Sequence, residues 1–212
     1  MIAWPEGVIT VAAFFILAAY HLYFAYQVRN HPLDTSVGLT NRLRREWVQT
    51  VMEGKRDILA VQTMRNWIMT SSFLASTAIL IGLGLISVAF NEEYADKFSH
   101  ALNFFGTKSH QLWLAKLLVL VVDFFFSFFN FTLSIRYYNH ASVAINVPPS
   151  MDPIVDYDTV TRIINHGSLH YTLGMRGYYL AIPFTLWLFG AAWMLLGVVI
   201  LTPILYNLDR TA

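Results

Sequence analysis

Four apolar runs, each long enough to cross a membrane as a helix, constrain the fold more than any other feature of the sequence. They cover about residues 7–26, 67–90, 112–135 and 180–205. A helix of about 20 apolar residues crosses a hydrocarbon core of about 30 Å. Because a lone segment in lipid must satisfy its own backbone hydrogen bonds, a helix is the structure that suits these runs. We therefore expect an all-α integral membrane four-helix bundle, with residues 1–212 forming a single domain.

The composition agrees with a protein that lies mostly in lipid. Of the 212 residues, 56% are hydrophobic and only 13% are charged, whereas soluble domains carry about 25% charged residues. The formal net charge of +1 and the lack of a dominant basic stripe argue against a nucleic-acid partner. The chain has no cysteine, so disulfides, thiol catalysis and thiolate metal sites are excluded.

The positive charges predict how the runs cross the membrane. The connection at 27–66 contains seven Lys and Arg residues, and the connection at 136–179 contains three. The opposite side has only Lys97, Lys108 and Arg210. Because Lys and Arg gather in cytoplasmic loops, we expect both connections to be cytoplasmic and both termini to be outside. The expected membrane is a bacterial inner (plasma) membrane.

The first of these connections is expected to be ordered. Its apolar residues recur at helical spacing with charged residues between them, which predicts an amphipathic helix along the membrane surface. Gly54 interrupts this helix, and Asp57 is a candidate N-cap for a second helix that continues into the run at 67–90. In the other connection, three prolines within 148–153 end the third helix, and Asp158 is a candidate cap for a short helix. The apolar residues of the amphipathic helix are Leu39, Leu43, Trp47, Val48, Val51 and Met52.

A polar seam follows the third run. Lys116, Asp123 and Asn130 are seven residues apart and therefore lie close to one helical face. Asp123 falls near the middle of the membrane, where an unpaired carboxylate is costly, and His21 of the first run is one of its candidate partners. These four residues form the predicted buried polar seam. Polar contact between helices is the favoured interpretation, and a proton or ion relay is the alternative.

Arginines lie at one end of three different apolar runs, at Arg65, Arg136 and Arg176. If the spans alternate in direction, all three meet on the cytoplasmic face. Guanidinium groups bind phosphate and carboxylate through paired hydrogen bonds. A network that closes the bundle or assembles subunits is favoured here, and a site for an anionic lipid headgroup or a small anion is the alternative. With the amides around them, these arginines form the predicted cytoplasmic rim: Gln62, Arg65, Asn66, Arg136, Asn139, Asn165 and Arg176.

Three histidines on the cytoplasmic side are candidate metal ligands. His166 and His170 are four residues apart, which places both side chains on one helical face, although Gly167 between them weakens that helix. No carboxylate completes a site with them or with His140, and haem needs ligands at matched depth on facing helices. Hydrogen-bonded structural histidines are the favoured interpretation, and no cofactor is predicted. Bound lipid, haem and metal stay open as alternatives.

Several blocks of the sequence resemble one membrane family. The first is ILAVQT at 58–63, followed by Arg65 and Asn66, the second is SIRYY at 134–138, and the third lies within 165–179. They are similar, in the same order, to the bacterial and plant family catalogued as domain of unknown function 599. The resemblance extends over nearly the whole chain and implies a four-span membrane protein. It implies no established activity, cofactor or catalytic residue.

The sequence favours a protein without enzymatic activity. It contains no nucleophile elbow, phosphate loop, dinucleotide fingerprint or metalloprotease motif. We expect an accessory or scaffolding subunit of a larger membrane complex, whose partners are membrane lipids, other membrane-protein subunits or further copies of itself. The alternative is a small proton- or anion-coupled transporter, or a membrane metal or haem redox protein, that uses Asp123, His21 and the cytoplasmic rim.

Overall fold

The computed structural model describes residues 4–54, 56–91, 110–147 and 154–211. These residues form α-helices and one short 3-10 helix, with no β-strand among them, which confirms the predicted all-α fold. The helices are α1 (Trp4–Asn30), η1 (Pro32–Asp34), α2 (Ser36–Glu53), α3 (Asp57–Ala89), α5 (His110–Ala144), α6 (Tyr157–Trp187) and α7 (Ala191–Asp209).

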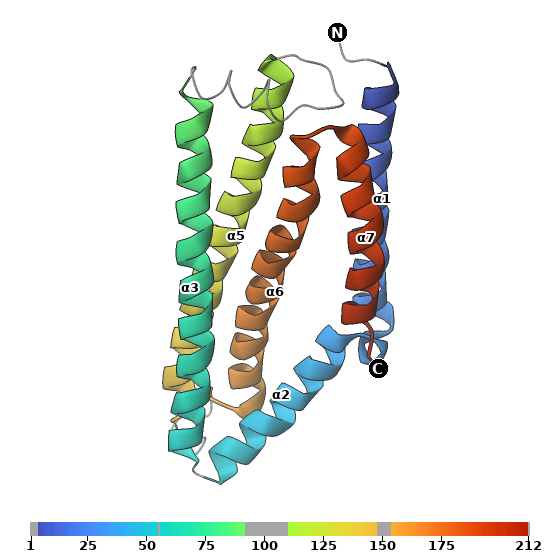
Figure 1. Ribbon diagram of the computed structural model, residues 1–212. Coiled ribbons are helices and arrows are strands. Elements are labelled where there is room, and N and C mark those ends of the chain that lie inside the picture. The colour runs from blue at the N-terminus through green and yellow to red at the C-terminus, as the bar shows by residue number, and fades with distance from the viewer. Residues whose placement is uncertain (1–3, 55, 92–109, 148–153, 212) are drawn as a thin grey trace.

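The long helices form two groups that meet at α6 (Figure 1). α5 packs against α3 on one side and against α6 on the other, and α7 packs against both α1 and α6. α2 runs obliquely from the end of α1 to the start of α3 and packs across the first half of α6. The order across the molecule is therefore α3, α5, α6 and then the α1–α7 pair, which places α3 far from α7.

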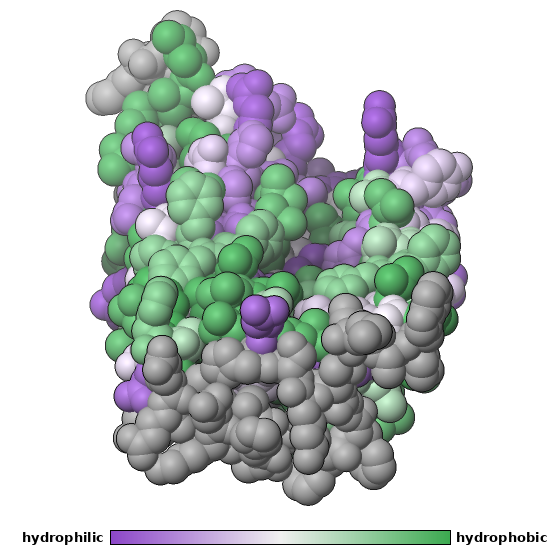
Figure 2. All heavy atoms as spheres, turned by 90° about the horizontal axis from the view of Figure 1, so that it is seen from above, coloured by the Kyte–Doolittle hydropathy of each residue, from purple (hydrophilic) through white to green (hydrophobic). Residues whose placement is uncertain are grey.

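Four described helices, α1, α3, α5 and α7, are long and apolar enough to cross a membrane. The predicted runs at 7–26, 67–90 and 112–135 correspond to the first three, which confirms the membrane-bundle prediction. Seen from above, hydrophobic side chains reach the outer surface of the bundle, with hydrophilic side chains among them (Figure 2). Such hydrophobic side chains suit lipid. The exposed apolar residues include Val8, Val11 and Phe15 of α1, Phe73, Leu80 and Leu83 of α3, and Val199 and Ile200 of α7.

The fourth predicted run, 180–205, is not one helix. α6 ends at Trp187, α7 begins at Ala191, and the two helices pack against each other. Gly190 has φ 141° and ψ 160°, a backbone conformation that is essentially restricted to glycine. The chain therefore reverses direction inside the apolar run. α7 meets the length and hydropathy criterion for a span by itself, and the second half of α6 runs antiparallel beside it through the same layer (Figure 1).

This reversal places the first turn of α1 and the last turn of α7 at opposite ends of the bundle (Figure 1). Thr35, just after α1, forms an isolated β-bridge with Arg210, and Thr211 N donates to Asp34 O at 3.3 Å. The arrangement differs from the prediction that both termini lie on one side. Arg210 therefore lies at the end of the bundle that carries the basic connections, and not at the opposite end where the prediction placed it.

α3, α5 and α6 continue beyond the end of α7 as a smaller bundle. The end of α7 lies level with Arg176 of α6, and Tyr178, half a turn away, donates a hydrogen bond to the carbonyl of Leu74 in α3. Residues 57–72 of α3 therefore extend about 24 Å beyond that level. We name residues 57–72, 132–145 and 157–175 the basic extension, and α2 packs against it. The core that it forms with Val48 and Val51 of α2 consists of Ala60, Met64, Tyr138, Ala141, Ile145, Val160 and Ile164.

α2 is amphipathic as predicted, but part of its apolar face contacts protein. Val48 and Val51 are buried in the core of the basic extension, and Trp47 lies 5.7 Å from Trp67 between ring centroids. Leu39 and Leu43 remain exposed. α2 therefore ties the α1–α7 pair to the basic extension, because its two ends contact different groups of helices.

Two predicted helix starts differ from the structure by one or two residues. Asp57 is the first residue of α3, and Arg56 occupies its N-cap position. Asp156 caps α6 in place of Asp158, since its carboxylate accepts from Thr159 N at 2.7 Å. α6 is also much longer than the predicted short helix. The prolines within 148–153 and the outer residues Lys97 and Lys108 lie outside the described residues.

Candidate functional site

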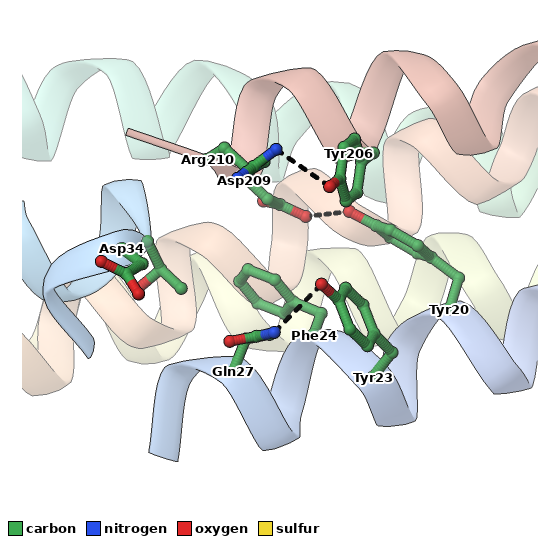
Figure 3. A pocket seen from close by; sticks show the side chains of 9 residues that line it. Tyr20, Tyr23, Phe24, Gln27, Asp34, Tyr206, Asp209 and Arg210 are labelled. Carbon is green, nitrogen blue, oxygen red and sulfur yellow. Dashed lines mark hydrogen bonds between the residues drawn. The ribbon is translucent and has the colours of Figure 1, made fainter. Parts of the chain in front are cut away.

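A largely buried ion pair joins three helices at the end of α7. Arg176 Nη2 of α6 donates to both carboxylate oxygens of Asp209, at 2.7 Å each. Tyr20 reaches from α1 to donate to the same carboxylate (Figure 3). The guanidinium carbon of Arg176 lies 4.0 Å from the ring centroid of Phe24, within cation–π range. Asp209 therefore fixes α1, α6 and α7 together.

The three arginines of the predicted cytoplasmic rim do not meet. Arg65 of α3 and Arg136 of α5 are exposed, whereas Arg176 is buried and directed towards α1 and α7. α7 lies on the opposite side of the molecule from α3 (Figure 1). The prediction assumed only that the arginines share one end of the bundle, and it did not consider which face of each helix they occupy. The exposed rim residues are Gln62, Arg65, Asn66, Arg136 and Asn139.

The remaining rim residue, Asn165, contacts an arginine that the sequence reading did not select. Arg44 Nη1 of α2 donates to Asn41 Oδ1 at 2.7 Å and to Asn165 Oδ1 of α6 at 3.3 Å. A sequence signal for Arg44 existed, because Arg44, Val48 and Val51 are spaced to share the buried face of one helix. Burial lowers the pKa of the Arg44 guanidinium.

Three residues of the predicted buried polar seam are buried, His21 is half-buried, and the seam is not continuous. Lys116 is 2% exposed, and its Nζ lies 3.3 Å from Glu6 Oε1 of α1 and 5.6 Å from the Trp187 ring centroid. His21 Nδ1 donates a hydrogen bond to Leu17 O of its own helix at 2.8 Å. Neither Lys116 nor His21 forms a hydrogen bond with Asp123 among the described residues.

Asp123 and Asn130 contact α6 at two different levels. A Cβ built on Gly177 would lie 3.3 Å from Asp123 Oδ1, and Asp123 Oδ2 is buried with no hydrogen-bond partner among the described atoms. Asn130 Nδ2 donates to Phe126 O at 2.9 Å, and its Oδ1 lies 3.0 Å from His170 Nδ1. These contacts agree with the use of polar residues for helix–helix packing.

Two of the three candidate histidines contact one tyrosine. His166 and His170 both stack on Tyr137. Their ring centroids lie 5.4 and 5.5 Å, respectively, from the ring centroid of Tyr137. Burial, followed by the nearby His166, lowers the pKa of His170. His140 is exposed. No three His, Asp or Glu side chains of the described residues are close enough together to hold a metal ion.

Three cavities lined by described residues open near the basic end, which is the end of the bundle that carries the basic connections. A small one of about 90 Å³ lies between α1 and α7 and contains Tyr20, Tyr206 and Asp209 in its wall (Figure 3). A second, of about 410 Å³, lies between α2 and the first half of α6. The third, of about 310 Å³, lies between α2, α6 and α7 and is lined by both Arg44 and Arg176. Its size is in the usual range for small-ligand sites.

No curated protein and no solved structure matches this chain. One family model does match, and its description is protein of unknown function, DUF599. The match covers residues 8–212 and so includes every site residue discussed above except Glu6. The chain therefore belongs to the family described as protein of unknown function, DUF599.

Proposed function

We propose that this protein is a non-enzymatic accessory or scaffolding subunit that binds another protein through its basic extension. The observation that carries the proposal is a set of large apolar side chains exposed on the extension. Ile58 is 81% exposed and Val61 is 49% exposed on α3, and Val143 of α5 is 70% exposed. Contiguous exposed apolar surface on a protein often marks a binding site.

Lipid does not account for these side chains if α7 spans the bilayer. α7 has 19 residues, which matches a hydrocarbon core of about 30 Å. The extension begins where α7 ends, and Ile58 lies about 24 Å further along α3. Ile58 and Val61 would then stand in water, so a protein partner is the surface that can cover them.

The surroundings of Ile58 indicate the chemistry of that partner. Residues 58, 62, 65 and 69 lie on one face of α3 by their spacing, and Gln62, Arg65 and Met69 are exposed there. Apolar anchors beside arginine are typical of protein interfaces. We therefore expect a partner that presents an apolar patch bordered by carboxylates.

Site-specific photo-crosslinking tests this proposal. A photoreactive amino acid at position 58 should crosslink one defined protein in native membranes, and mass spectrometry would identify it. Ile58→Glu should remove that protein from the particle purified in mild detergent, because a carboxylate would enter an apolar, acid-bordered contact. Thr50→Glu is the control, since Thr50 is exposed on α2. A monodisperse particle without a partner, and no crosslink at position 58, would refute the proposal.

A further inference from the structure

The cavity between α2, α6 and α7 combines positive charge, hydroxyl groups and an apolar wall. Its volume is about 310 Å³. Arg44 of α2 and Arg176 of α6 line it, and Tyr171 and Thr172 add hydroxyl groups. Leu208 of α7 contributes to the apolar part of its wall. The cavity is separate from the exposed face of α3, so an inference about it does not depend on the proposed protein partner.

Arg44 brings an uncompensated charge to this cavity. It is half-buried, and its hydrogen bonds go to two neutral amides, Asn41 and Asn165. No carboxylate of the described residues forms a salt bridge with it, although the exposed Arg45 beside it pairs with Asp158 at 2.7 Å. A partly desolvated cation without a counter-charge is unfavourable. An anion in the cavity would relieve that cost.

Arg176 contributes hydrogen-bond capacity rather than net charge. It is 7% exposed, and Asp209 balances its charge. Both bonds to Asp209 come from Nη2, while Nη1 is buried with no partner among the described atoms. Asp209 also lines the cavity, but it already accepts from Arg176 and Tyr20. The wall therefore keeps one net positive charge, which Arg44 supplies.

We propose that this cavity binds a phosphate ester, with Arg44 as the cation that pairs with the phosphate. Guanidinium groups match phosphate oxygens through two parallel hydrogen bonds. The cavity lies at the level where α7 ends, which is the membrane boundary if α7 spans. A phospholipid headgroup and a soluble phosphate ester both reach that level, and Leu208 suits the glycerol or acyl part of a lipid.

Binding measurements on the purified protein in mild detergent test the site. The probes are short-chain phosphatidylglycerol, short-chain phosphatidylcholine, glycerol 3-phosphate and inorganic phosphate, each titrated separately by thermal shift and native mass spectrometry. The variants are Arg44→Gln and Arg45→Gln, which are adjacent on α2 and lose the same charge. Arg44→Gln should weaken binding of the anionic probe about tenfold, the loss of one charge-assisted hydrogen bond. Arg45→Gln should leave binding unchanged.

Each outcome decides the proposal. Binding of phosphatidylglycerol but not of the soluble phosphates supports a lipid headgroup, and the reverse supports a soluble ester. Equal losses in Arg44→Gln and Arg45→Gln would mean that only surface charge attracts the anion, which overturns the site. Failure of every phosphate probe to bind would also overturn it. If Arg44→Gln does not fold, Thr172→Val removes a cavity hydroxyl without changing charge and should weaken binding of the same probe.

Discussion

Asp209 is the residue through which α1, α6 and α7 are joined, so its charge should matter for stability. Asp209→Asn keeps the size of the side chain but leaves the buried Arg176 without a counter-charge. Removing one partner of a buried pair costs about 3 kcal/mol, and a clear fall in melting temperature in mild detergent is expected. Asp158→Asn removes the partner of the exposed Arg45 and should leave the melting temperature unchanged. Equal effects would show that the Asp209 pair is not buried in the folded protein.

The close contact of α5 and α6 depends on a glycine at the level of Asp123. A Cβ on Gly177 would lie 2.0 Å from Ser127 Oγ, so Gly177→Ala should force the helices apart and destabilise the protein by about 2 kcal/mol. Adding Ser127→Ala removes that oxygen. The double variant should therefore recover most of the lost stability, as measured by thermal unfolding. Gly84→Ala is the matched control, because nothing lies within 4 Å of its Cβ. No rescue by Ser127→Ala would contradict the contact.

At the scale of an element, α2 should be held by its buried valines rather than by lipid. Val48 is fully buried against the basic extension, and Leu43 is 56% exposed. Val48→Ala should cost about 2 kcal/mol, from two lost carbons and the space they leave. Hydrogen exchange along α2 should accelerate in Val48→Ala and stay at the wild-type rate in Leu43→Ala. The opposite result would indicate that α2 is anchored to the membrane through its other face.

At the same scale, three of the four candidate spans were predictable from the sequence. Hydropathy located α1, α3 and α5, because a helix that crosses lipid must be apolar along about 20 residues. The same criterion could not divide 180–205, since the residues on both sides of Gly190 are apolar and hydropathy carries no information about chain direction. Only the positive φ of Gly190 marks the reversal.

The candidate site was less predictable than the helices for a related reason. Arg176 was identified from the sequence, but its partner Asp209 lies 33 residues away in a helix whose direction was unknown. A helical pattern was available, since Leu201, Leu205 and Asp209 are four residues apart and the two leucines are buried. The pattern predicts a buried face, yet it does not predict which helix that face contacts.

At the scale of the whole molecule, the reversal at Gly190 predicts on which side the chain ends. The chain has no cysteine, so single cysteines can be labelled from outside with a membrane-impermeant maleimide. Thr211→Cys should behave like Thr50→Cys of α2, because Thr211 bonds to the segment just before α2. Both should react only after permeabilisation if the basic end is cytoplasmic, whereas Asn91→Cys should react in intact cells. Reaction of Thr211→Cys together with Asn91→Cys would mean that 180–205 crosses the membrane as one span, with no reversal at Gly190.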